Sequence, residues 1–206
     1  MEIYLEVGQK KVAAYALEWP GWCRLARSRK EAVQALLDYV PRYRVIAQRA
    51  GLDFEPDDLV TTEVVGDTNT DWGVPAIIVP ADLEPVDAVR ATRRVALLRA
   101  AWEVMDEVVA ASPAELRKGP RGGGRDRDKI VSHVIEAERS YVRKIGVCHK
   151  PFPHNDRAAL AAMRAEIAEV LSRPASGTPA WPASYAIRRI AWHVTDHIWE
   201  IEDKRQ

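Results

Sequence analysis

The chain has 206 residues, 47% of them hydrophobic and 29% charged, the balance of an ordinary globular protein, so disorder along the whole length is excluded. Thirty lysine and arginine residues balance thirty aspartate and glutamate residues, and this zero net charge argues against nucleic acid as a partner. No apolar run approaches the ~20 residues of a membrane span, which argues against a membrane partner.

The N-terminus and the cysteines indicate the compartment. Residues 1–6 show neither the basic segment nor the apolar core of a secretory signal, so we expect a cytoplasmic protein. Cys23 and Cys148 are too few for a disulfide framework and lack the CxxC spacing of metal or redox sites. We expect both to be free thiols.

Residues 1–82 predict a small domain of strands and helix. Apolar and polar residues alternate over Ile3–Val7, the period of a strand with one buried face. Two more strands are predicted at 11–19 and 22–25, and Pro20 and Gly21 break the chain between them.

A capping box follows the third strand. Ser28 and Glu31 have its spacing, which predicts a helix that begins at Arg29. Pro41 must kink or end this helix, and the apolar pattern resumes over residues 46–50. Short strands are then predicted at 61–65 and 76–79, with turn residues at 66–69.

Residues 83–206 predict an antiparallel four-helix bundle, so the predicted fold class is α+β. Apolar residues recur every three and four positions, beginning in the first helix with Val89, Val95 and Leu98. The predicted helices cover about 85–111, 128–145, 156–171 and 184–204. The connection from Arg117 to Lys129 contains the run Gly122–Gly124, but it lacks the ending and the preceding strand of a phosphate-binding loop.

Three of the five histidines fall on the apolar stripes of two helices. His193 and His197 lie four residues apart on the last helix, and His133 lies on the second. Each buried imidazole would cost several kcal/mol unless its nitrogens find a partner, and one divalent cation satisfies three at once. We therefore predict a metal site formed by these three residues. The alternative is that each histidine hydrogen-bonds to a carbonyl or carboxylate in the core.

Four other residues bear on this site. Glu136 and Glu200 each follow a site histidine by three residues, so either could be an outer acceptor, a fourth ligand, a general base or a solvated surface residue. His149 and His154 lie in a proline-rich link off any stripe, and we expect them to be exposed.

Seven tryptophans are many for this length, and Trp181, Trp192 and Trp199 lie in or beside the last helix. Trp192 and Trp199 are offset from the histidine stripe. They could form an apolar strip for a second subunit, giving a homodimer, or pack against the N-terminal domain.

The helical part resembles the DinB/YfiT-like superfamily of metal-binding four-helix bundles. The resemblance is carried by residues 128–138, which include His133, and by residues 192–197, which include the other two histidines. It implies a three-histidine divalent metal site on His133, His193 and His197. Some members of the superfamily are transferases and isomerases that use low-molecular-weight thiols, and many have no known reaction.

The N-terminal part resembles the HicB-like antitoxin domain. The residues concerned are the predicted hairpin 3–16, the stretch 18–22 and the capped helix start 28–33. In that family the domain binds a toxin. No DNA-binding segment follows, so the resemblance implies an interface or a cover for the metal site rather than a repressor.

The leading hypothesis is a metal-dependent enzyme that acts on a small-molecule substrate, through thiol transferase or hydrolase chemistry. Zinc or nickel fits the imidazole ligands, although ligand type alone does not choose the metal. The alternative is a non-catalytic module in which a metal stabilises the fold and the N-terminal domain binds a partner. A toxin-antitoxin role is a third hypothesis.

Overall fold

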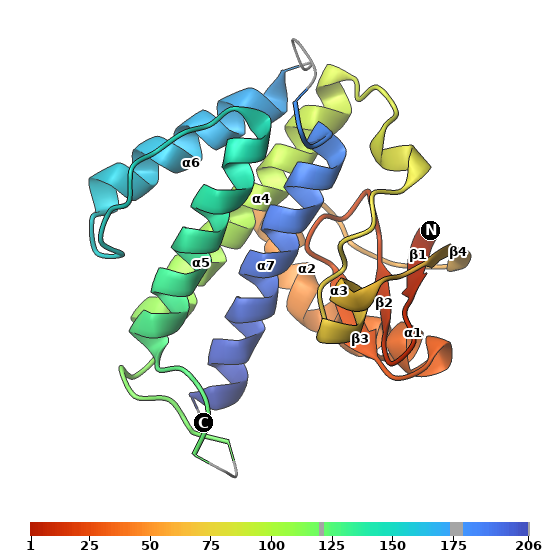
Figure 1. Cartoon of the computed structure of the whole chain (residues 1–206), viewed down its shortest axis with the longest axis horizontal. Helices are drawn as coiled ribbons and strands as arrows, with labels where there is room; N and C mark the ends of the chain where they lie inside the picture. The colour runs from red at the N-terminus through yellow and green to blue at the C-terminus, as the bar shows by residue number, and fades with distance from the viewer. Residues whose placement is uncertain (120–121, 174–178, 206) are drawn as a thin grey trace.

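The computed structural model describes residues 1–119, 122–173 and 179–205, so residues 120–121 of the predicted glycine-rich connection lie outside it. Within these residues the fold is α+β, with a four-stranded mixed sheet near the N-terminus and seven α-helices (Figure 1). The strands are β1 (Glu2–Val7), β2 (Val12–Tyr15), β3 (Cys23–Ala26) and β4 (Val60–Val65). The helices are α1 (Arg29–Asp38), α2 (Val40–Arg49), α3 (Thr68–Trp72), α4 (Ala88–Ala110), α5 (Arg127–Val142), α6 (Arg157–Ser172) and α7 (Ala183–Lys204).

The sheet has the strand order β3-β2-β1-β4, in which β1 pairs antiparallel with β2 and parallel with β4. The prediction of one buried face for β1 is wrong. Ile3 and Leu5 are buried, as the alternation indicates, but Tyr4 and Glu6 on the other face are buried too. The reason is that both faces of the sheet are covered, which a pattern with a period of two cannot reveal.

Glu6 also explains why residues 76–79 do not form the predicted strand. The backbone N–H groups of Ala76 and Ile77 each donate to the Glu6 carboxylate at 3.1 Å. Pro75 and Pro80 bracket this segment and have no N–H to donate. The segment therefore runs extended without a strand partner and ends in a 3-10 turn at Pro80–Asp82.

The helix starts in the N-terminal part follow local capping rules. The Ser28 hydroxyl accepts from the Glu31 N–H, as predicted, and Pro41 lies in the first turn of α2, where it ends α1 without breaking a helix interior. The predicted turn at 66–69 is instead the start of α3. Its N-cap is Asp67, whose carboxylate accepts from the Asn69 and Thr70 N–H groups.

The four helices from α4 to α7 lie side by side, with α7 against α4 and α5, and α6 against α4 and α5 (Figure 1). Their bounds lie within three residues of the predicted ones. One residue of the predicted stripe, Val89 in the first turn of α4, is 79% exposed. No described helix is long and apolar enough to cross a membrane.

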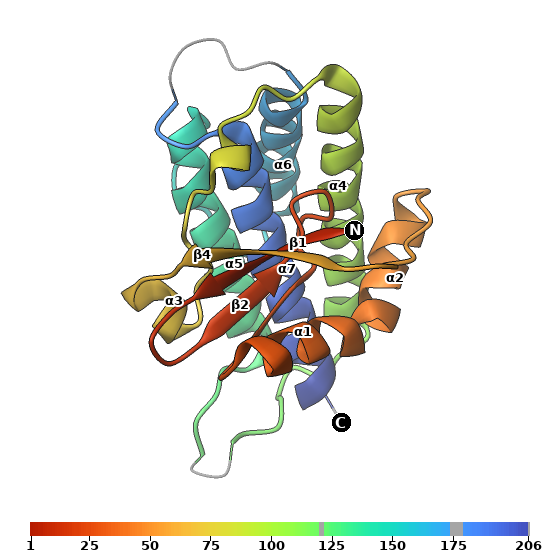
Figure 2. The same ribbon diagram turned by 90° about the vertical axis from the view of Figure 1, so that its right-hand side faces the viewer.

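The two parts of the chain share one hydrophobic core. Its largest cluster joins β1, β2, α1 and α2 to residues of α4 to α7, and α2 packs alongside α4 (Figure 2). Trp192 and Trp199 are 5% and 2% exposed, and they contact residues of the N-terminal part, including Tyr15 and Tyr39 respectively. The tryptophans therefore pack within the chain and form no surface strip. The homodimer prediction loses the observation on which it rested.

We expect Glu6→Gln to change the pH dependence of stability. Burial raises the pKa of Glu6 above its ordinary value, so the folded chain keeps this proton to higher pH than the unfolded chain does. The stability that Glu6 contributes therefore falls as pH rises through its folded pKa. The difference in unfolding free energy between variant and wild type, measured in urea between about pH 4 and about pH 8, should move in favour of the variant as pH rises.

Glu63→Gln is the control. Glu63 is exposed and Arg29 lowers its pKa, so any shift with pH should be small and of the opposite sign. A Glu6→Gln difference that is independent of pH would contradict a raised pKa of Glu6 in the folded chain.

Candidate metal centre

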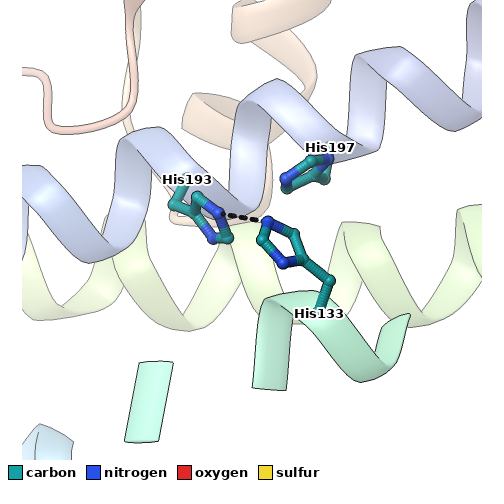
Figure 3. Close-up of side chains that lie close together, drawn as sticks. All are labelled: His133, His193 and His197. Atoms are coloured by element: carbon teal, nitrogen blue, oxygen red, sulfur yellow. Dashed lines mark hydrogen bonds between the residues drawn. The ribbon is translucent and has the colours of Figure 1, made fainter. Parts of the chain in front are cut away.

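The three predicted histidines meet on the seam between α5 and α7. His193 and His197 lie on successive turns of α7, and His133 lies on the facing side of α5 (Figure 3). One nitrogen from each ring can be chosen so that the three atoms all lie within 4.8 Å of one another. The stripe spacing of both helices positions them, because residues four apart on a helix share one face.

The His197 ring lies edge to face with the other two rings, and the His133 and His193 rings are tilted by 58° to each other. The centroids of the His193 and His197 rings are 4.6 Å apart, and that of His133 is 5.0 Å and 5.1 Å from these two. The Nε2 atoms of His133 and His193 are 3.2 Å apart. Two ring nitrogens at this distance need either a proton or a cation between them.

The surroundings of His193 and His133 favour the neutral form of both rings. Burial, followed by the positive charges that His197 and His133 would carry, lowers the pKa of His193 to about 2. Burial, and then the charge of Arg125, also lowers the pKa of His133. A neutral imidazole has a free lone pair, which is the form that binds a metal.

Glu200 holds the third imidazole in place. Its carboxylate lies 2.6 Å from Nδ1 of His197, and it also accepts a hydrogen bond from Lys204. The His197 hydrogen bond, with support from Lys204, lowers the pKa of Glu200 to about 2, so the group is a carboxylate at neutral pH. Nδ1 of His197 therefore donates to Glu200, and Nε2 is left as the free nitrogen of this ring.

The structure separates the other sequence candidates from this cluster. Glu136 is exposed and belongs to no metal-ligand group among the described residues. His149 and His154 are half-buried rather than exposed, and His149 lies 2.8 Å from Glu166. Neither histidine joins the cluster. Of the two glutamates left open by the sequence, Glu200 is the one that contacts a site histidine.

Sequence reasoning missed two buried charged residues on the helices that carry the histidines. Arg189 is buried on α7 one turn before His193, and its guanidinium contacts Tyr141 of α5. Glu138 is buried on α5 and accepts hydrogen bonds from Trp102 and Arg164. A charged residue inside a helical pattern usually indicates a solvated face. The only sequence signal for the burial of Arg189 and Glu138 is that each lies on a stripe of otherwise apolar residues.

The donor set fits a divalent cation. When two nitrogens bind one zinc ion at ~2.1 Å with a tetrahedral angle between them, they lie about 3.4 Å apart. The Nε2 atoms of His133 and His193 are 3.2 Å apart, which is close to this value. Nδ1 of His193 is buried and has no hydrogen-bond partner among the described residues. A bound cation would offset the desolvation of these rings, and the group could hold one.

In comparisons with known proteins, no family model, curated protein or solved structure matches the chain. The DinB-like and HicB-like resemblances therefore stay predictions that rest on the quoted residues.

Proposed function

We propose that the chain binds one divalent metal ion, zinc or nickel, through His133, His193 and His197 and is a metal-dependent enzyme for a small molecule. The observation that carries the proposal is the convergence of three histidines, one nitrogen from each within 4.8 Å of the others, on the seam between α5 and α7. In this proposal α4 to α7 form the antiparallel four-helix bundle of the DinB-like superfamily.

The number of protein ligands favours catalysis over a structural role. The group contains three histidines and no carboxylate or thiolate among the described residues. Structural zinc sites are closed by four protein ligands, whereas catalytic sites have three and keep one position for substrate. Glu200 is already engaged on the far nitrogen of His197.

When bound, the metal would act as a Lewis acid and lower the pKa of a coordinated thiol or water toward neutrality. The residues of the chain have supporting roles. Glu200 fixes the tautomer and orientation of His197. A low-molecular-weight thiol is the proposed co-substrate, as the resemblance implies.

The alternative is a non-catalytic interaction module. The structure offers one observation in its favour, because the N-terminal part packs along α7 through Trp192 and Trp199, and a metal beside these residues would stabilise that junction. The two proposals differ in whether a ligand other than protein can exchange at the metal.

The first test is metal binding by His197→Ala. Loss of one of three ligands should lower the affinity for Zn²⁺ by more than about 100-fold, beyond the effect of losing an outer hydrogen-bond partner. The measurement is a competition titration with a chelator of known affinity, and circular dichroism checks the helical content. His149→Ala, which removes a half-buried histidine outside the cluster, is the matched control and should bind Zn²⁺ as the wild type does. Equal affinity in the two variants would refute the site.

The second test distinguishes an enzyme from a structural site. We expect the Co²⁺-loaded protein to develop a sulfur-to-metal charge-transfer band when 2-mercaptoethanol is added, because a three-histidine site leaves a position for the thiolate. An absorption spectrum that is unchanged at saturating thiol would favour the interaction module.

The third prediction concerns Glu200→Ala. Without the carboxylate, Nδ1 of His197 loses its acceptor and the ring loses its fixed tautomer, so the affinity for Zn²⁺ should fall by about 10- to 100-fold. Glu136→Ala, on an exposed position of α5, is the control. A loss of equal size in both variants would mean that general charge near the site, rather than the hydrogen bond, controls affinity.

A further inference from the structure

Arg189 is a buried cation without a counter-charge. Its side chain lies on the stripe of α7 that also carries Tyr185, His193 and His197, and the residue is only 5% exposed. Its Nη2 atom is 3.3 Å from the Tyr141 hydroxyl, and its Nη1 atom is 3.4 Å from the Pro75 carbonyl oxygen. Its Nε atom has no hydrogen-bond partner among the described residues.

The other two buried arginines show what Arg189 lacks. Arg188 is 2.6 Å from the Asp82 carboxylate, and Arg94 is 2.7 Å from Glu18. Arg189 has no carboxylate within 4.0 Å among the described residues, and its hydrogen bonds are long. Burying a charge without a counter-charge is unfavourable, so this guanidinium is suited to an anion that comes from outside the chain.

The surroundings of Arg189 indicate what kind of anion fits. The guanidinium carbon lies 4.7 Å from the centre of the Trp192 ring and 5.1 Å from that of Tyr141. Tyr141 in turn lies 5.5 Å from the Trp181 ring and 5.7 Å from the His193 ring. Trp181 and Tyr141 are both half-buried, so this aromatic row joins the surface to the histidine cluster.

We propose that Arg189 binds the carboxylate of a small organic acid with an apolar body, whose other end reaches the histidine cluster. The part about the cluster rests on the proposed metal function. A monocarboxylate matches the single uncompensated charge and the planar guanidinium, which bonds a carboxylate through two parallel N–H groups. A phosphate dianion would bring a second negative charge into a largely aromatic environment.

The experiment uses phenylacetate as the probe and phenylacetamide as its uncharged match. Binding to the full-length protein, with and without Zn²⁺, is measured by calorimetry and tryptophan fluorescence. We expect phenylacetate to bind the wild type at least tenfold more tightly than phenylacetamide. Arg189→Gln should lose at least tenfold in phenylacetate affinity, because a charge-assisted pair is replaced by a neutral one. Arg143→Gln, on an exposed position after α5, is the control and should lose nothing.

Each other outcome overturns the proposal. Equal phenylacetate affinity in Arg189→Gln and wild type would mean that the anion is held elsewhere, and tighter binding of phenyl phosphate would reject the monocarboxylate. If Arg189→Gln does not fold, the guanidinium Nε–H signals of the ¹⁵N-arginine-labelled wild type decide the question, with the Arg189 signal assigned through Arg189→Lys. That signal must shift with phenylacetate and not with phenylacetamide.

Metal content, measured on the same samples, separates this proposal from the proposed function. Carboxylate binding that depends on Arg189 in a protein without affinity for Zn²⁺ would support the anion site and refute the metal site. Zn²⁺ binding without phenylacetate binding would support the metal site and refute the anion site.

Discussion

The burial of α7 on nearly every side is the constraint on which the rest of the structure depends. Trp192, Thr195 and Trp199 turn toward the N-terminal part, while His193 and His197 turn toward α5. A helix in this position must supply partners for the polar groups on both of its sides, because little water reaches them. The site and the packing of the two parts are therefore set by one helix.

The contact between α7 and the Pro-Gly turn shows how closely the two parts fit. The Thr195 hydroxyl donates to the Gly21 carbonyl oxygen at 2.8 Å, and a side chain at Gly21 would begin 2.9 Å from the Thr195 methyl group. Gly21 also has a φ of +98°, which side chains rarely adopt. The glycine predicted to break the chain thus permits the backbone to approach α7.

The sequence was informative where a local period or a cap decides the structure. The long helices and the convergence of His133, His193 and His197 follow from a spacing of three and four, since a shared stripe places side chains on one seam. The start of α1 could be predicted because the cap formed by Ser28 and Glu31 involves only residues within one helical turn.

Other features depend on neighbours distant in the sequence, and no local pattern contains them. Glu6 looks like the solvated side of a strand until residues 76–77 cover it. Trp192 and Trp199 look like a surface strip until the N-terminal part packs on them. Arg189 and Glu138 look like charges on a helix surface, and only the position of the adjacent helices buries them.

Buried polar atoms without partners are concentrated on one stretch of α7. Glu6 and Glu138 are fully buried, yet neither carboxylate has an unpartnered oxygen among the described residues. Between Arg188 and His193, by contrast, four side chains each keep at least one buried nitrogen without a partner. Native proteins satisfy most such groups, so a concentration of exceptions within two turns of one helix needs a specific cause. An anion from outside the chain would account for the unpartnered nitrogen of Arg189, whereas a cation held by Nε2 of His193 would leave Nδ1 of the same ring in need of an acceptor.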